Sequence, residues 1–156
     1  MNALFNTRPQ ALLALADGIV FEGFSCGAEG QAQGTLAVST TSSGYQQVAS
    51  DPANAGSVMV FTYPQIGNSG CNAEDDLGSA VAAVVVRDLC PTPSSFRSTQ
   101  DFDSFLAARG IVGIEGVDTR ALVCYLRDHG PQAAIVSTTC TDPVQLAAAA
   151  AQLAAE

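Results

Sequence analysis

The residues of this chain that could act as a nucleophile and a base are five cysteines and a single histidine, His129. A cysteine activated by a histidine would therefore have to pair His129 with Cys124 or Cys140. His129 falls at the expected end of a helix, where an imidazolium interacts favourably with the helix dipole and the last carbonyl groups. We interpret His129 as a structural residue and keep a cysteine hydrolase as an open alternative.

Metal and phosphate chemistry have little support in the sequence. Residues 74–76 (Glu-Asp-Asp) could bind a hard cation, but the ligand spacing and the glycine of an EF-hand loop are missing, so we expect a solvated acidic loop. The spaced glycines at Gly110, Gly113 and Gly116 do not form the dinucleotide fingerprint, and a Walker loop would need a lysine, which the chain lacks. We therefore predict a binding or scaffolding domain with no catalytic residue, no metal and no cofactor.

Composition predicts a folded domain that does not bind nucleic acid. The chain has 156 residues, of which 47% are hydrophobic and 13% charged, as is typical of a globular domain. Its net charge of −9 and its six scattered arginines argue against phosphate-backbone binding. The acidity either serves solubility or complements a basic partner.

The cysteines and the apolar segments indicate where the protein works. The five cysteines are odd in number and form no Cys-x-x-Cys pair, so we expect reduced, mostly buried thiols and a cytoplasmic protein. We find no signal peptide pattern and no apolar run of the ~20 residues that would span a bilayer.

Apolar runs and turn signals predict several strands. Residues 11–15 and 19–23 are apolar runs on either side of Asp17-Gly18, a strong hairpin signal. The runs at 57–61 and 81–86 suit strands that are buried on both faces. Shorter strand candidates lie at 35–39 and 133–136.

Capping residues predict three helices. Ser98 is the expected N-cap of a helix that has Asp101 in its first turn and ends at Gly110. Asp118 is placed to cap a helix that runs to about residue 128, and Asp142, followed by a proline, to start an alanine-rich helix that runs to residue 155. Strands dominate early and alternate with helices late, which predicts the α/β class with a mixed sheet and helices on one side, or two sheets plus a helical layer.

Short motifs along the chain carry a resemblance to a known family. Its elements are Gly44-Tyr45-Gln46, Asp51-Pro52, Thr62-Tyr63-Pro64, Ile66-Gly67-Asn68, Glu74-Asp75-Asp76, Val86-Arg87-Asp88-Leu89 and Val117-Asp118-Thr119-Arg120. In order and spacing they resemble the N-terminal domain of the small subunit of glutamine-dependent carbamoyl-phosphate synthase. The resemblance covers roughly residues 11–136.

The resemblance implies a fold, a set of domains and a set of partners. It implies a three-layer β/β/α domain at residues 11–140, after an N-terminal extension at 1–10 and before a C-terminal helix or linker at 141–156. In the family the linker leads to a class I glutamine amidotransferase domain, which supplies ammonia to a large ATP-using subunit that makes carbamoyl phosphate for pyrimidine and arginine synthesis. We expect this chain to dock to that large subunit and to have no glutaminase activity of its own.

One position is implied to contact glutamine. In the family a serine after the Asp-Pro turn touches the glutamine pocket, and here that position is Ala53. Thr35, Ser39, Gln47 and Gln65 likewise replace a usual glutamate, asparagine, glutamate and histidine. The alternative function is a stand-alone small-molecule-binding or scaffolding module that has diverged from the family.

Overall fold

A computed structural model describes residues 9–41, 44–66, 71–72, 76–89, 100–140 and 142–155 of the chain. The strands are β1 (Gln10–Leu15), β2 (Val20–Gly27), β3 (Gln31–Ser39), β4 (Val58–Phe61), β5 (Ala83–Val85), β6 (Val112–Glu115) and β7 (Ala133–Ser137). The helices are α1 (Tyr45–Ser50), the 3-10 helix η2 (Pro52–Asn54), α2 (Phe102–Ala108), α3 (Thr119–His129) and α4 (Pro143–Ala155). Within these ranges, no helix has the length and apolar character needed to cross a membrane.

The strands close into one barrel in the order β1-β2-β6-β5-β4-β3-β7. The neighbours from β3 through β4 and β5 to β6 are parallel, whereas the remaining pairs, including the closing pair of β1 and β7, are antiparallel. β4 and β5 are buried along their whole lengths, as expected for parallel strands covered on both faces. The barrel therefore has a parallel half that needs helices outside it.

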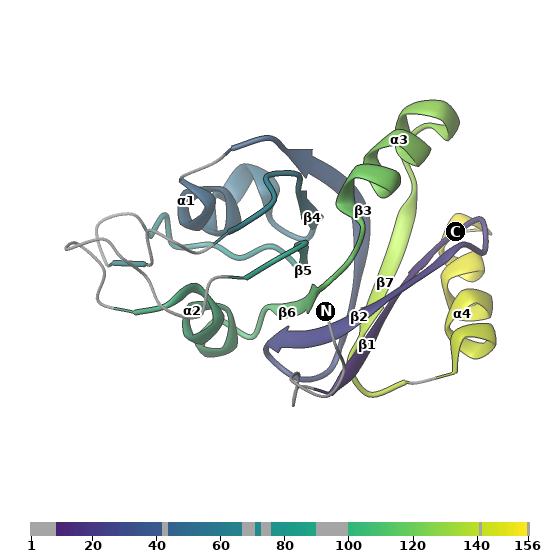
Figure 1. The fold of residues 1–156 in the computed structure, drawn as a ribbon, viewed down its shortest axis with the longest axis horizontal. Helices are drawn as coiled ribbons and strands as arrows, with labels where there is room; N and C mark the ends of the chain where they lie inside the picture. The colour runs from purple at the N-terminus through teal and green to yellow at the C-terminus, as the bar shows by residue number, and fades with distance from the viewer. Residues whose placement is uncertain are drawn as a thin grey trace.

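Three hydrophobic clusters hold the barrel and its helices together. The first fills the barrel interior and includes Leu13, Val60, Ile114 and Leu122 of α3. The second lies under α1 and α2, and the third lies between β1, β7 and α4. Figure 1 shows α1 and α2 on the left of the strands, α4 on the right and α3 above them.

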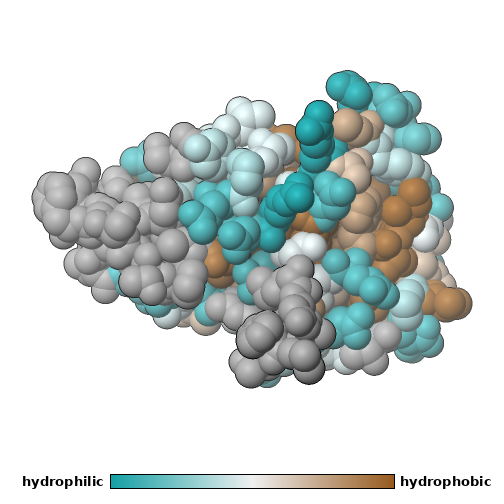
Figure 2. Space-filling view, viewed as in Figure 1, coloured by the Kyte–Doolittle hydropathy of each residue, from teal (hydrophilic) through white to brown (hydrophobic). Residues whose placement is uncertain are grey.

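The surface in this view is divided at α3. Strongly hydrophilic residues lie to the left of α3, and hydrophobic surface gathers below it, between α3 and α4 (Figure 2). Ile19 and Val38 are among the large apolar side chains that stay exposed, at 36% and 43%.

The α/β class and the mixed sheet are confirmed. The expected hairpin is present, since β1 pairs with β2 around a turn in which Gly18 has a φ of 102°. The arrangement of the layers differs in two respects from the expectation. The strands form one closed barrel, and the helices cover more than one side of it because β4 and β5 on one side and β1 and β7 on another each present an apolar outer face.

Aspartates cap the helices, as predicted for two of them. Asp118 accepts a hydrogen bond from the backbone N–H of Ala121 at 3.1 Å, and Asp142 accepts one from Val144 at 3.0 Å. For α2 the predicted cap was misplaced: the cap is Asp101, which accepts from the backbone N–H of Ser104 at 2.7 Å. Ser98 lies outside the described residues, as do residues 1–8, Cys90 and the predicted breaks at 67–70.

Candidate functional site

The Asp51-Pro52 turn is a short, largely exposed segment at the end of α1. Asp51 ends α1 and begins η2, and its carboxylate accepts a hydrogen bond from the backbone N–H of Ala53 at 2.9 Å. The carbonyl of Asp51 accepts a second bond from the N–H of Asn54 at 2.9 Å. The side chain of Ala53 is exposed. The turn therefore presents a methyl group to solvent on a backbone that is already hydrogen-bonded.

The turn is fixed at both of its ends. The side-chain amide of Asn54 donates to the carbonyl of Val48 in α1 at 3.0 Å. On the other side, Gly56 leads into β4 and packs so closely on β3 that a Cβ added at Gly34 would lie 2.2 Å from the Gly56 carbonyl oxygen. A side chain at Gly34 would displace the turn, so the sequence needs a glycine there.

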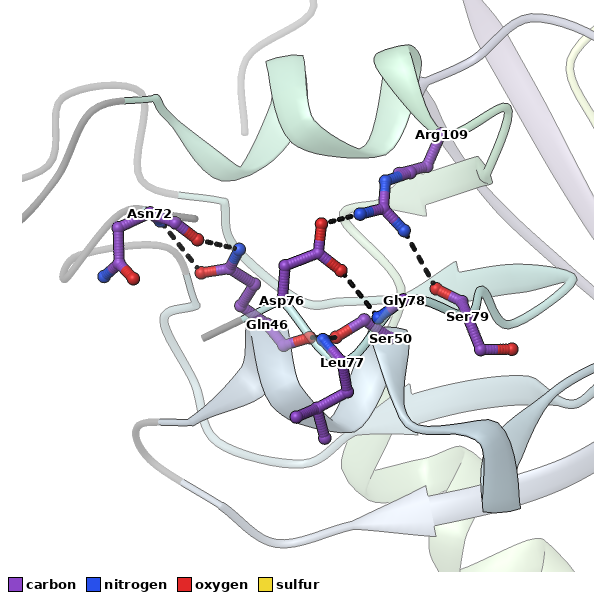
Figure 3. A network of polar contacts seen from close by, with 8 residues as sticks. All are labelled: Gln46, Ser50, Asn72, Asp76, Leu77, Gly78, Ser79 and Arg109. Atoms are coloured by element: carbon purple, nitrogen blue, oxygen red, sulfur yellow. Dashed lines mark hydrogen bonds and ion pairs between the residues drawn. The ribbon is translucent and has the colours of Figure 1, made fainter. Parts of the chain in front are cut away.

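A network of polar contacts ties α1 to the segment that follows β4 in the chain (Figure 3). Gln46 is 4% exposed, and its amide donates to the carbonyl of Asn72 at 2.6 Å while its oxygen accepts the Asn72 N–H at 3.0 Å. Ser50 is fully buried; its hydroxyl donates to the carbonyl of Gln46 at 2.7 Å and accepts the N–H of Leu77 at 3.0 Å. Gln46 and Ser50 therefore fasten the backbone of Asn72 and Leu77 to α1.

An ion pair closes the network on the side of α2. The guanidinium of Arg109 pairs with the carboxylate of Asp76 and also donates to the carbonyl of Ser79 at 3.2 Å. Asp76 accepts the N–H of Gly78 at 2.9 Å, and the Arg109 guanidinium lies 5.3 Å from the centre of the Phe105 ring. We call Gln46, Ser50, Asp76 and Arg109 the α1 anchor.

The α1 anchor corrects one prediction from the sequence. Asp76 belongs to the stretch expected to be a solvated acidic loop, yet its side chain is 23% exposed and ion-paired with Arg109. Glu74 and Asp75 lie outside the described residues. The sequence reasoning also missed Ser50 and Arg109, because neither stands in a motif whose chemistry is recognisable from sequence alone.

The structure does not bring His129 to either cysteine. The Nδ1 atom of His129 lies 3.0 Å from the carbonyl oxygen of Tyr125, and the two rings stack with centroids 4.0 Å apart. The thiol of Cys140 instead faces the carbonyl of Asp142 at 3.7 Å. Among the described residues, no hydrogen bond joins His129 to Cys124 or Cys140, and no three His, Cys, Asp or Glu side chains are grouped so that they could hold a metal ion.

Most of the chain matches one known protein family. Residues 13–136 match the family of the carbamoyl-phosphate synthase small chain, CPSase domain. This range includes the Asp51 turn and all four residues of the α1 anchor. The chain belongs to this family. The resemblance of the short motifs is thereby confirmed.

Individual relatives belong to the same family and are longer than this chain. The carbamoyl phosphate synthase small chain of Syntrophotalea carbinolica is 45% identical over 139 residues, which are 88% of this chain and 37% of that protein. The small chain of Thermosynechococcus vestitus is 45% identical over 138 residues, 87% of this chain and 36% of the relative. The small chain of Bradyrhizobium diazoefficiens is 43% identical over 136 residues, which are 83% of this chain and 34% of that protein. The chain thus spans a little over a third of the length of these small chains.

Proposed function

We propose that this chain is the non-catalytic N-terminal domain of a glutamine-hydrolysing carbamoyl-phosphate synthase small subunit. In this role it docks to the large ATP-using subunit and packs on a class I glutamine amidotransferase domain. It completes the wall of the glutamine site with the Asp51 turn and helps to align the path by which ammonia reaches the large subunit. The observation that carries the proposal is the family match over residues 13–136.

The geometry of the Asp51 turn supports this role. A wall of a binding site must be exposed and must keep its shape, because an ordered contact costs less entropy on binding. The turn meets both conditions, since Ala53 is exposed while Asp51 and Asn54 hold the backbone through hydrogen bonds of 2.9 and 3.0 Å. An alanine at this place offers glutamine a methyl contact and no side-chain hydrogen bond.

The Ala53→Ser variant of the assembled synthase tests the assignment of this wall. A serine would add a neutral hydrogen bond to glutamine, so we expect the KM for glutamine to fall about 2- to 10-fold. The rate with free ammonia should stay the same, because ammonia bypasses the glutamine site. The measurement is carbamoyl phosphate synthesis at varied glutamine and at varied ammonia.

Ala55→Ser is the matched control, since Ala55 is an exposed alanine of the same segment, two residues further on. We expect it to leave both rates unchanged. An unchanged KM for Ala53→Ser, or an equal change for both variants, would remove the turn from the glutamine site.

The cellular role follows from the same proposal. The carbamoyl phosphate would feed pyrimidine and arginine synthesis in the cytoplasm, within a heteromeric complex. The odd number of cysteines and the lack of a Cys-x-x-Cys pair in the sequence support a reducing compartment.

A further inference from the structure

A small hollow lies where two of the sequence motifs meet. Arg87, from the motif after β5, and Thr119 and Arg120, from the motif that begins α3, line a hollow of about 290 Å³. Thr62, Pro64, Val123 and Cys124 complete its lining. We call it the α3 hollow. It contacts the segment that follows β4, whereas the Asp51 turn precedes β4, so the two sites lie at opposite ends of that strand.

The positive charges at the α3 hollow are only weakly neutralised. The guanidinium of Arg87 lies 4.0 Å from the carboxylate of Asp118, and both side chains are more than half exposed, so water screens this pair strongly. The side chain of Arg120 forms no ion pair or hydrogen bond with any residue that the structure describes. No acidic side chain is among the described residues that line the hollow. Two guanidinium groups are therefore available to an anion.

The hydroxyl group of one largely buried residue, Thr119, opens on the same hollow. Thr119 is 1% exposed and lines the hollow, yet its hydroxyl has no hydrogen bond with a described residue. The Thr119 oxygen is not among the buried side-chain atoms that lack a partner, so it is open to the hollow, where it can bond to water or to a ligand. The hydroxyl of Thr62 differs, because it already donates to the carbonyl of Ser39 at 3.3 Å. Thr119 is thus the hydroxyl that can donate into the hollow.

The remaining lining is apolar and restricts the kind of anion. Val123 and Pro64 present carbon atoms to the hollow. Its volume is close to the ~300 Å³ at which small-molecule sites begin. Planar guanidinium groups match a carboxylate in a two-bond geometry. A short acid with an apolar body suits this combination better than a fully hydrated inorganic ion.

We propose that the α3 hollow is a binding site for a small organic carboxylate. The carboxylate lies between Arg87 and Arg120 and accepts a hydrogen bond from the hydroxyl of Thr119. The apolar body of the ligand packs on Val123 and Pro64. The site is separate from the Asp51 turn and does not depend on the proposed function.

The test uses benzoate as the probe and benzamide as its neutral counterpart, both added to the chain at constant ionic strength. Amide chemical shifts from NMR report binding at each residue. We expect benzoate to shift the amides of Arg87, Thr119, Arg120 and Cys124 in a saturable way, and benzamide to bind at least tenfold more weakly. Equal binding of both compounds, or no saturable shift with benzoate, would overturn the proposal.

Arg120→Gln and Arg127→Gln form a matched pair on α3. Both remove one positive charge, but the Arg127 side chain is 74% exposed and lines a different depression of the surface. Loss of a charged hydrogen bond predicts about tenfold weaker benzoate binding for Arg120→Gln. Arg127→Gln should change it less than twofold. Equal weakening by both variants would mean that benzoate responds only to net charge and would refute the site.

Discussion

The α1 anchor and the α3 hollow are both polar clusters beside the barrel, and they differ in how many of their groups have partners. In the α1 anchor, Gln46 makes two hydrogen bonds to the backbone of Asn72, and Arg109 pairs with Asp76 and Ser79. In the α3 hollow, the guanidinium of Arg120 and the hydroxyl of Thr119 have no hydrogen bond or ion pair with a described residue. The polar groups of the α1 anchor are bonded to other groups of the chain, whereas those of the α3 hollow are available to bind a ligand.

This difference separates a structural role from a binding role. Side chains that bond to buried backbone groups stabilise the fold. When such a side chain is removed, the backbone group stays buried without a partner, and the fold loses the full desolvation free energy of that group. Side chains without partners add little to stability, and their loss is felt only when a ligand is present. Mutation of the two clusters should therefore affect different measurements.

The largest effect is expected for Gln46→Ala in the α1 anchor. The variant leaves the N–H and the carbonyl of Asn72 without their side-chain partner, because Gln46 bonds to both. We expect the free energy of unfolding to fall by about 3 kcal/mol. Urea denaturation followed by circular dichroism measures it.

Gln152→Ala is the control for this variant. Gln152 is an exposed glutamine on α4, and its removal should cost less than about 0.5 kcal/mol. A loss of less than 1 kcal/mol for Gln46→Ala would contradict the structural role of the anchor.

A somewhat smaller effect is expected for Arg109→Met. This change removes the partner of the Asp76 carboxylate, whose side chain is 23% exposed, and the bond to the Ser79 carbonyl. Because the pair is only partly buried, we expect a loss of about 2 kcal/mol, below that of a fully buried pair. Arg127→Met, at a side chain 74% exposed, should change the unfolding free energy by less than about 0.5 kcal/mol. Similar losses in both variants would show that the ion pair contributes nothing specific.

The smallest effect on stability is expected for Thr119→Val in the α3 hollow. The two side chains have nearly the same shape, and the hydroxyl that is removed has no partner among the described residues. We expect the free energy of unfolding to change by less than about 0.5 kcal/mol or to rise, while benzoate binding weakens about 3- to 10-fold. A large loss of stability with unchanged binding would assign Thr119 to the fold rather than to the hollow.

The sequence predicts those parts of the fold that depend on local signals. Asp17-Gly18 defines the first hairpin, and Asp118 and Asp142 locate the starts of α3 and α4. The six-residue helix α1 was not predicted, because it is short and its N-cap, Gly44, offers no side-chain hydrogen bond. Strand β6 was not predicted either, since Gly113 interrupts its apolar pattern.

Features that depend on distant contacts could not be read from the sequence. Gly113 is required in β6 because an added Cβ would lie 2.6 Å from the Cys26 sulfur of β2, a neighbour known only once the strands pair. Closure of the barrel similarly depends on β7 pairing with both β1 and β3. The α3 hollow arises only when the segment after β5 meets α3, so the motifs that contain Arg87 and Arg120 indicated a family and not a ligand site. The role of Ala53 at the glutamine site stays a prediction.

Co-purification with the cognate large subunit of carbamoyl-phosphate synthase tests the proposed function most directly. The tagged chain and the large subunit would be mixed at micromolar concentrations and separated by size-exclusion chromatography, with light scattering to give the mass of each peak. The account predicts a stable complex that contains one copy of this domain for each large subunit. Separate elution of the two proteins at these concentrations would contradict a docking role for this domain.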